Sequence, residues 1–273
     1  MLNPSETVGA VVQAGRAKAA LGLRPHAILA ALAGAYIGFG AILALRVTGN
    51  LDPALGNVIK LLFGLAFPVG LLLVLMAGAS LFTGDVMYMT GSFAAGGSSA
   101  GRSLRVLSVS YLGNFLGSVL IAFLAVESGV FMDQGPDGSL PLAETAIALA
   151  NSKCSLGFQA AFLRGIVCNW LVCLAIFMSL RAADGVSKAI LMWPPITAFV
   201  AMGMEHSVAN MCFVPLGLFL GGTEAAAQAG LALTADWGSF LFRNLLPVTL
   251  GNILGGALFV ALPYLWLAPP GKA

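Results

Sequence analysis

Long apolar runs recur along the chain, and they limit the possible folds more than any single motif does. Each is long enough to cross the hydrocarbon core of a bilayer as a helix, which needs about 20 residues. The runs cover approximately residues 27–48, 58–93, 106–127, 158–181, 189–220 and 239–267. With 59% hydrophobic and 9% charged residues, the chain departs from the composition of a soluble domain. The sequence therefore predicts an all-α membrane protein with six transmembrane helices.

Charged residues outside these runs indicate how the chain is oriented. Residues 1–26 contain no long apolar core, so we expect an amphipathic helix on the membrane surface and not a cleavable signal peptide. A transmembrane domain over residues 27–268 and a tail over residues 269–273 follow. The basic residues of the predicted loops gather on one side: Arg16, Lys18, Arg24, Arg102, Arg105, Arg181, Lys188 and Lys272. Lysine and arginine are enriched in cytoplasmic loops, so we expect a multi-pass protein of the cytoplasmic (inner) membrane with both termini in the cytoplasm.

A short internal repeat relates the two halves of the chain. The sequence LGNFLGSVL at residues 112–120 matches LGNILGGAL at residues 250–258 in six of nine positions. Each half holds three crossings, an odd number, so the halves are expected to be inverted relative to each other in the membrane. Close helix packing also selects small residues, so packing alone is the alternative explanation. We predict an inverted 3+3 repeat in which the second and fifth helices are interrupted.

The first predicted interruption lies in the second apolar run. Gly78 and Gly84 bracket Leu81, Phe82 and Thr83, so the backbone can leave the helix there and present its amides and the Thr83 hydroxyl. Irregular backbone at membrane depth is tolerated only inside protein or along a water-filled cavity. A simple glycine kink is the alternative.

The second predicted interruption covers residues 204–210 and contains ionisable groups in an apolar run. Glu205, His206 and Asn210 all fall within it. Charged or titratable groups at this depth are costly and usually mark a pathway, although a histidine held by neighbouring polar groups can also be structural. We expect His206 and Thr83 to approach each other from the two interruptions, near the membrane midplane.

Two other classes of function are disfavoured by missing motifs. An aquaporin-type channel for neutral solutes would need paired Asn-Pro-Ala loops, and the only Asn-Pro is Asn3-Pro4. An intramembrane enzyme would need a motif such as HExxH, a serine–lysine pair or paired aspartates within the apolar runs, and none is present. The cysteines have no zinc-site spacing and are expected to be small buried side chains: Cys154, Cys168, Cys173 and Cys212. We therefore expect no catalytic residue, metal or cofactor.

Several motifs together resemble those of the formate/nitrite transporter family. They are AGAYIGFGAIL at 33–43, SLFTG at 80–84, CNWLVCLAIFM at 168–178, EHSVANM at 205–211 and NLLPVTLGNILGG at 244–256. The resemblance covers essentially the whole chain in the order found in the family. It implies a homopentamer with an aquaporin-like protomer fold and one anion pore in each protomer.

The resemblance also implies roles for particular residues. Leu71, Leu81 and Val172 are expected to form the cytoplasmic constriction of the pore, and Phe67 and Phe199 the outer one. Phe82 is a further expected constriction residue. The expected substrate pathway between and outside them comprises Lys153, Glu205, His206 and Asn210 with Thr83 and Asn169. Two positions depart from the family pattern, because Ser80 stands where an acidic residue is usual and Met204 where an aromatic one often stands.

This arrangement suits a small anion of a weak acid. Lys153 would draw anions toward the pore, while apolar rings would make a bare charge costly. His206, with an ordinary pKa near 6.5, could supply a proton or stabilise the anion, and Glu205 would tune it. We expect formate as the first substrate, since Pro215 and Pro247 look more like the formate and hydrosulfide branches; nitrite and hydrosulfide are the alternatives. The expected partners are this anion, protons, the lipid bilayer and further copies of the chain, with no nucleic acid.

Overall fold

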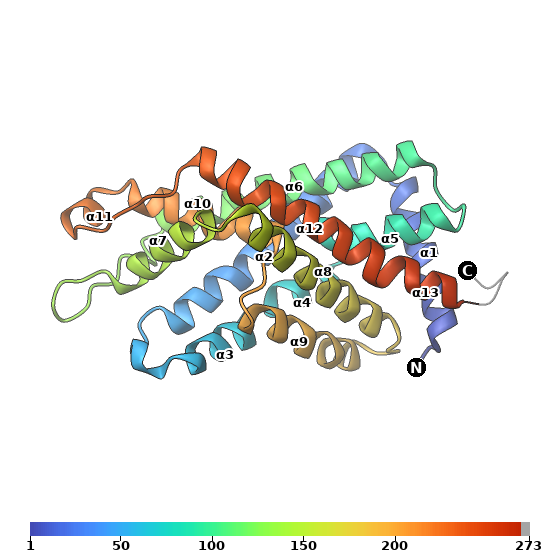
Figure 1. Cartoon of the computed structure of the whole chain (residues 1–273), viewed down its shortest axis with the longest axis horizontal. Helices are drawn as coiled ribbons and strands as arrows, with labels where there is room; N and C mark the ends of the chain where they lie inside the picture. The colour runs from blue at the N-terminus through green and yellow to red at the C-terminus, as the bar shows by residue number, and fades with distance from the viewer. Residues whose placement is uncertain (269–273) are drawn as a thin grey trace.

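The computed structural model describes residues 1–268, and within this range the regular secondary structure is entirely helical (Figure 1). The helices are α1 (Pro4–Ala20), α2 (Leu23–Thr48), η1 (Pro53–Leu55), α3 (Asn57–Ala66), α4 (Val69–Ala77), α5 (Phe82–Ala94), α6 (Ala100–Glu127), α7 (Pro141–Cys154), α8 (Phe158–Leu180), α9 (Gly185–Ala201), α10 (Ser207–Gly221), α11 (Glu224–Gln228), η2 (Ser239–Leu245), α12 (Leu246–Gly256), η3 (Ala257–Ala261) and α13 (Leu262–Leu267). The tail predicted for residues 269–273, which includes Lys272, lies outside the described residues.

Apolar helices of membrane-spanning length account for most of the described chain. Between residues 1 and 268, five helical stretches are long and apolar enough to cross a bilayer: Leu23–Thr48, Asn57–Ala77, Ala100–Glu127, Phe158–Leu180 and Ser239–Leu267. The fifth predicted run, 189–220, instead folds as two shorter apolar helices, α9 and α10. The protein is thus an all-helical, multi-pass membrane protein.

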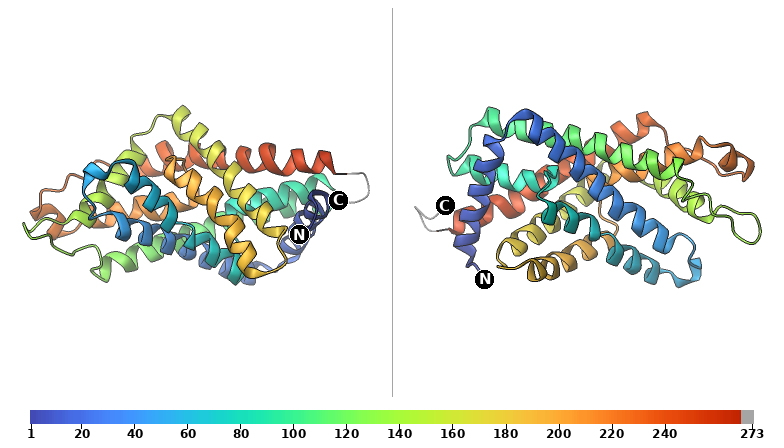
Figure 2. Two further views of the ribbon diagram at one scale, coloured as in Figure 1. Left: turned by 90° about the horizontal axis from the view of Figure 1, so that it is seen from below. Right: turned by 180° about the vertical axis from the view of Figure 1, so that it is seen from behind.

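The helices run mostly along the long axis of the molecule, and the two ends of that axis differ (Figures 1 and 2). Helices α1 and α13 lie at one end, whereas α7, α11 and the loop before α7 lie at the other. Helix α2 packs along α6, and α8 packs along α12. A Cβ atom on Gly117 would collide with the Ala31 carbonyl, and one on Gly251 with the Phe162 carbonyl, so glycine permits both close approaches.

Both predicted interruptions are present, but each ends a few residues earlier than expected. Gly78 ends α4 in the left-handed conformation, at φ +70°, and the irregular segment, residues 78–81, which we call break 1, precedes α5. Gly203 does the same after α9, at φ +71°, and break 2 covers residues 202–206. Left-handed glycine is a common way to end a helix.

This placement corrects the sequence-based boundaries. Phe82 and Thr83 belong to the first turn of α5, and Asn210 belongs to the first turns of α10. The helices resume early because a polar partner satisfies the free backbone amide at each restart, on Phe82 and on Ser207. Thr83 and Asn210 therefore present their side chains from helices and not from irregular backbone.

Helix α1 packs across the end of the bundle that holds both described termini (Figure 2). Val8, Val11 and Val12 are buried, and α1 contacts α5 and α13. An asparagine cap at Asn3, closed by Glu6, fixes its first turn. Its location on a membrane surface stays a prediction.

The last apolar run is one continuous helical rod with two wider turns. The segments η2 and η3 are π-helical, and α12 and α13 continue each of them. Single π turns inside helices are often found at functional sites. Here η2 carries Asn244, a fully buried polar side chain.

Candidate functional site

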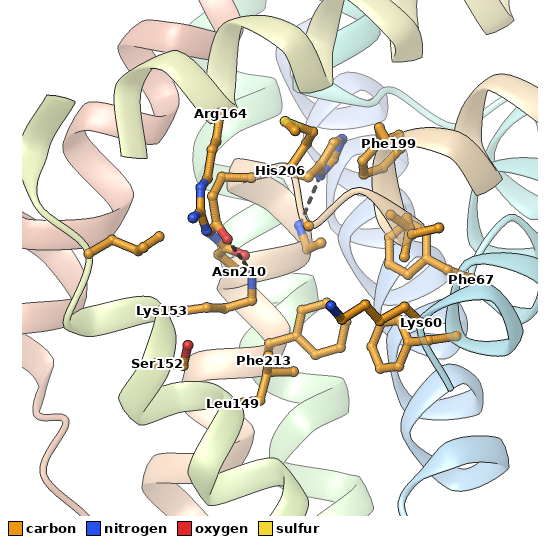
Figure 3. A pocket seen from close by; sticks show the side chains of 18 of the residues that line it. Lys60, Phe67, Leu149, Ser152, Lys153, Arg164, Phe199, His206, Asn210 and Phe213 are labelled. Atoms are coloured by element: carbon orange, nitrogen blue, oxygen red, sulfur yellow. Dashed lines mark hydrogen bonds and ion pairs between the residues drawn. The ribbon is translucent and has the colours of Figure 1, made fainter. Parts of the chain in front are cut away.

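A cavity of about 360 Å³, which we call the α7 cavity, opens near the end of the molecule that carries α7. Three cationic side chains line it, Lys60, Lys153 and Arg164, together with Glu205 and His206 (Figure 3). Met204 also lines this cavity. With three cations to one carboxylate among the described lining residues, the cavity has an excess of positive charge.

Lys153 and Glu205 form a buried ion pair on the wall of the α7 cavity. Lys153 Nζ lies 2.9 Å from Glu205 Oε1, and both side chains are almost fully buried. The other carboxylate oxygen accepts hydrogen bonds from Asn210 Nδ2 at 2.6 Å and Asn244 Nδ2 at 3.3 Å. Asn244 Nδ2 also donates to the Lys153 carbonyl at 3.0 Å. Such bonds are needed if a buried ion pair is to offset its desolvation.

His206 lies where break 2 meets α10, and both of its ring nitrogens have partners. Nδ1 accepts the backbone N–H of Ala209 at 3.0 Å, so the side chain caps the helix. Nε2 lies 3.0 Å from Thr83 Oγ1. Because Nδ1 must accept, we assign the proton of the neutral ring to Nε2, which then donates to Thr83. The Thr83 hydroxyl proton remains available for another acceptor.

The structure thus brings Thr83 of α5 and His206 together, as the sequence predicted. Asn169 of α8 contacts the backbone near this pair and not the two side chains. Its Nδ2 donates to the Thr83 carbonyl at 3.1 Å and to the Asn252 carbonyl at 2.7 Å. Of the predicted pathway residues, Lys153, Glu205, His206 and Asn210 line the α7 cavity.

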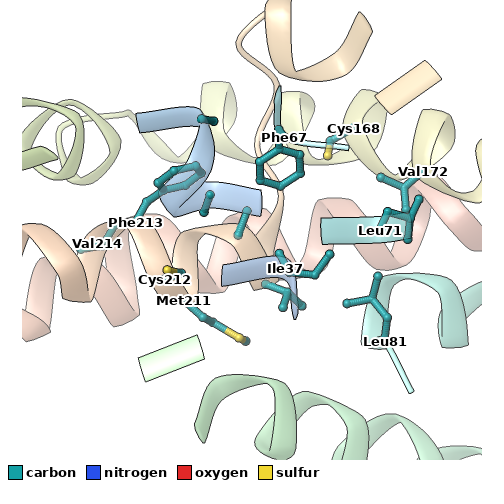
Figure 4. Close-up of a cluster of buried hydrophobic side chains, with 14 of the residues drawn as sticks. Ile37, Phe67, Leu71, Leu81, Cys168, Val172, Met211, Cys212, Phe213 and Val214 are labelled. Carbon is teal, nitrogen blue, oxygen red and sulfur yellow. The ribbon is translucent and has the colours of Figure 1, made fainter. Parts of the chain in front are cut away.

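Leu71, Leu81 and Val172 form an apolar group deeper in the molecule. All three are at most 3% exposed and belong to the same buried cluster (Figure 4). Phe67, which lines the α7 cavity, is one turn before Leu71, and Val74, one turn after it, lines a second cavity. The apolar group therefore separates the two cavities.

The aromatic residues predicted as constrictions divide into two sets. Phe67 and Phe199 lie edge to face, with centroids 6.0 Å apart, and both line the α7 cavity. The Phe199 ring also stacks 5.9 Å from His206. Phe82 is separate from them, because its ring packs on Tyr111 of α6 at 4.9 Å. The sequence placed Phe82 with Leu81, but adjacent residues at a helix start point in different directions.

The second cavity, of about 170 Å³, lies beside α1 and is called the α1 cavity. Lys18, Leu81, Asp85 and Tyr88 are among its lining residues. Lys18 Nζ lies 2.8 Å from Asp85 Oδ1 and donates to Ser80 Oγ at 2.8 Å. The sequence shows no serine–lysine pair within an apolar run, yet the fold creates one here by bringing in Lys18 from α1. With Asp85 beside it, this lysine is part of an ion pair.

Two asparagines of the repeated LGN sequence hold the breaks in place. Asn114 Oδ1 accepts the N–H of Phe82 at 2.8 Å, and its Nδ2 donates to the Ser80 carbonyl at 2.9 Å. Asn252 Oδ1 accepts the N–H of Ser207 at 2.8 Å, and its Nδ2 donates to the Glu205 carbonyl at 3.0 Å. Each Nδ2 also donates to one further helix, at the carbonyl oxygens of Ala30 and Gly165. The shared LGN sequence was the signal for these roles.

Comparisons with known proteins agree with one another. A sequence model for one family, described as formate/nitrite transporter, matches residues 5–266. A probable formate transporter of Methanothermobacter thermautotrophicus is 42% identical over 273 residues, covering 96% of this chain and 95% of that one. The nitrite transporter NirC of Escherichia coli (strain K12) is 40% identical, covering 89% of this chain and 83% of that one. A solved pentameric formate channel with formate bound is 34% identical, with a TM-score of 0.76 over 90% of this chain and 96% of that one.

Proposed function

The chain belongs to the formate/nitrite transporter family, and from this premise we propose that it passes small weak-acid anions, formate first, through a pore in each protomer. Relatives of this family carry the names of formate and nitrite transporters, so the protein is a membrane transport protein. The observation that carries the proposal for this chain is the α7 cavity, which leads from three cations to His206, the hydrogen-bond partner of Thr83.

The cations of the α7 cavity are proposed to concentrate the anion before it meets the apolar group. Glu205 compensates Lys153, so Lys60 and Arg164 account for the excess positive charge. A focused positive field raises the local concentration of anions and falls with added salt. Selection for charge would thus take place before the narrowest part of the path.

His206 and Thr83 are proposed to act where the anion loses its water. Neutral His206 donates through Nε2 to Thr83 Oγ1, so the Thr83 hydroxyl can donate to a carboxylate oxygen of formate. To hand over a proton, His206 must first hold two, and the second would face the Ala209 N–H at Nδ1. Proton supply would therefore require the first turn of α10 to loosen. A formic acid molecule without charge would cross the apolar group more easily than formate.

We further propose that the chain is an inverted repeat of three plus three crossings, with α9 and α10 completing the fifth. The matched bonds of Asn114 and Asn252 support this, because each binds a residue inside a break, the first residue of the helix after it and a carbonyl of an earlier helix. The excess of basic residues near α1 supports a cytoplasmic location for the α1 cavity and for both termini. The α7 cavity would then face the outside.

Flux into proteoliposomes tests the proposal. Purified protein would be compared with empty vesicles for uptake of formate, nitrite and hydrosulfide at matched concentration and pH, with glycerol as the neutral solute. We expect anion flux, fastest for formate, and no glycerol flux. Strong nitrite or hydrosulfide flux with negligible formate flux would change the substrate, whereas glycerol flux alone would reject anion transport.

A further inference from the structure

A second buried polar cluster lies beside the α1 cavity, and the function proposed above leaves it without a role. Five elements contribute to it: Lys18 of α1, His26 of α2, Ser80 of break 1, Asp85 of α5 and Ser110 of α6. His26, Ser80, Asp85 and Ser110 are at most 1% exposed. Asp85 is its centre, because one oxygen contacts Lys18 and the other accepts from both serine hydroxyls.

The hydrogen bonds of the cluster define which groups carry protons. Ser80 Oγ donates to Asp85 Oδ2 at 2.8 Å, and Ser110 Oγ donates to the same oxygen. His26 Nε2 lies 3.1 Å from the Ser80 hydroxyl oxygen and 3.0 Å from that of Ser110. Since both hydroxyl protons point to Asp85, we assign the ring proton to Nε2, where it is shared between the serines. Asp85 therefore sits among donors only, as an ionised carboxylate requires.

The lysine occupies the same position in both halves of the chain. Lys18 precedes Ala30 by as many residues as Lys153 precedes Gly165, and Ala30 and Gly165 are the carbonyl acceptors of the two matched asparagines. Lys18 contacts a carboxylate at 2.8 Å, and Lys153 contacts one at 2.9 Å. The two lysines are thus equivalent positions of the proposed inverted repeat.

Each lysine also lies near an aromatic ring, and the positions of these two aromatic residues correspond in the two halves. Lys18 Nζ lies 5.7 Å from the ring centroid of Tyr88, and Lys153 Nζ lies 5.6 Å from that of Phe213. Tyr88 follows the first residue of α5, Phe82, by as many residues as Phe213 follows the first residue of α10, Ser207. The breaks and the helices that follow them can therefore be compared residue by residue.

The carboxylates do not follow this correspondence. At that interval Glu205 corresponds to Ser80, and Asn210 corresponds to Asp85. Near α7 the acid is on the break and the neutral partner is on the helix; near α1 the neutral partner is on the break and the acid is on the helix. In each half the neutral residue donates a hydrogen bond to the acid: Asn210 Nδ2 to Glu205 Oε2 at 2.6 Å, and Ser80 Oγ to Asp85 Oδ2 at 2.8 Å.

We propose that Asp85 is the positioning residue of the α1 cavity, supplying from α5 the counter-charge that Glu205 supplies from break 2. It neutralises Lys18 and, through Ser80, holds break 1, which ends at Leu81 of the apolar group. This inference rests on the proposed transport function. It accounts for serine at position 80, since Asp85 on the next helix supplies the negative charge beside Lys18.

A consequence for transport follows from the charge of Lys18. While Asp85 compensates it, an anion in the α1 cavity can approach the ammonium without being held there. Without that carboxylate, a formate ion would take its place and bind at the same nitrogen. Asp85 should therefore set how tightly the α1 cavity retains an anion, and it should not affect entry through the α7 cavity.

The test compares formate flux from each side in inverted and right-side-out membrane vesicles. For Asp85→Asn we expect the half-saturating formate concentration to fall about tenfold for entry through the α1 cavity, together with a lower maximal rate. Entry through the α7 cavity should keep its half-saturating concentration. Asp184→Asn is the matched control, because it removes the same charge from the exposed cap of α9 and an asparagine caps equally well.

Moving the charge back provides the decisive variant. Ser80→Glu/Asp85→Asn copies the Glu205 and Asn210 arrangement, and we expect both flux parameters to return to within about twofold of the original protein. If Asp85→Asn does not assemble, recovery of assembly and flux in the double variant is the supporting result. Unchanged flux in assembled Asp85→Asn, or a double variant that assembles without recovering flux, would overturn the proposal.

A measurement without transport separates this inference from the proposed function. Thermal unfolding in detergent of Lys18→Met, Asp85→Asn and the combination of the two should show that the second substitution costs little once the first is made. Additive losses would contradict the pairing. If the original protein passed another anion in place of formate, the proposed substrate would fail, and the same variants would be measured with that anion.

Discussion

His206 caps α10 in the structure and is proposed to supply a proton, and one substitution can separate these two roles. The cap needs only an acceptor, whereas proton supply needs a titratable ring. Asparagine is a good helix cap but has no titration near neutral pH. We therefore predict that His206→Asn assembles normally while the dependence of formate flux on pH becomes flat. Stopped-flow measurements on proteoliposomes at fixed formate concentration would show this.

The corresponding control is His206→Phe, which removes both functions. It should lose the pH dependence and also about 1 kcal/mol of free energy of unfolding, because the N–H of Ala209 loses its cap. If His206→Asn kept the original pH profile, His206 would be a structural cap only, and the proton path proposed here would be wrong.

The ion pair of Lys153 and Glu205 makes a second prediction at the scale of residues. Lys153→Met leaves a buried carboxylate without its cation, so we expect a loss of about 3–5 kcal/mol in the free energy of unfolding. Adding Glu205→Gln should recover most of it, since the glutamine can still accept from Asn210 and Asn244. Thermal unfolding in detergent measures both.

Formate uptake distinguishes the role of charge from that of stability in the same variants. It should remain low in the double variant, because methionine has no ammonium group to donate to a passing anion, although the net charge of the α7 cavity is unchanged. Full recovery of uptake along with stability would show that Lys153 has a structural role only. Equal losses of stability in the single and double variants would contradict the pairing itself.

At the scale of elements, the two breaks depend on glycines with left-handed backbone. Gly78 and Gly203 have φ of +70° and +71°, and a Cβ on either would meet no atom within 4 Å. The cost of Gly78→Ala or Gly203→Ala is therefore backbone strain alone, about 1–2 kcal/mol for each. Gly101→Ala in α6 is equally uncrowded but helical, so it should be neutral or slightly stabilising. Chemical or thermal unfolding in detergent compares the three, and equal effects at all three positions would contradict this account.

The breaks also show how far the sequence leads. Their existence followed from polar and glycine residues within apolar runs, whereas their boundaries were wrong by a few residues. The boundaries depend on Asn114 and Asn252, which bind the first amides of α5 and α10 from distant helices. A side chain that caps a helix from elsewhere in the chain leaves no local signal. The repeated LGN motif contained this information, but its spacing alone could not distinguish a cap from helix packing.

At the scale of the whole molecule, the all-helical, multi-pass membrane architecture followed from the apolar runs, and the contact of Thr83 with His206 followed from the two predicted interruptions. The α1 cavity did not. Lys18 lies in a segment that the sequence assigned to the membrane surface, and Asp85 lies inside an apolar run where it was not singled out. Only the packing of α1 on α5 brings the two charges together. Pairing across elements depends on tertiary structure that local patterns do not encode.

Assembly is the next prediction at this scale. Many large apolar side chains of the outer helices are exposed on the single chain, among them Leu112, Leu116 and Leu120 on one face of α6. Such surfaces contact lipid or another protomer. The family and the pentameric formate channel of similar fold lead us to predict a homopentamer. Native mass spectrometry in mild detergent should give a five-protomer species, and a stable monomer or tetramer would contradict it.

Within such a pentamer each protomer should transport independently. Both cavities and the apolar group between them lie within a single protomer, as expected if each protomer holds its own path. Val172→Trp should block a single path, because the large ring would fill the space beside Leu71 and Leu81. In pentamers assembled from mixtures of original and Val172→Trp chains, formate flux should fall in direct proportion to the fraction of variant chains. A much steeper fall, approaching the fifth power of the original fraction, would mean that the five chains share one path or must open together.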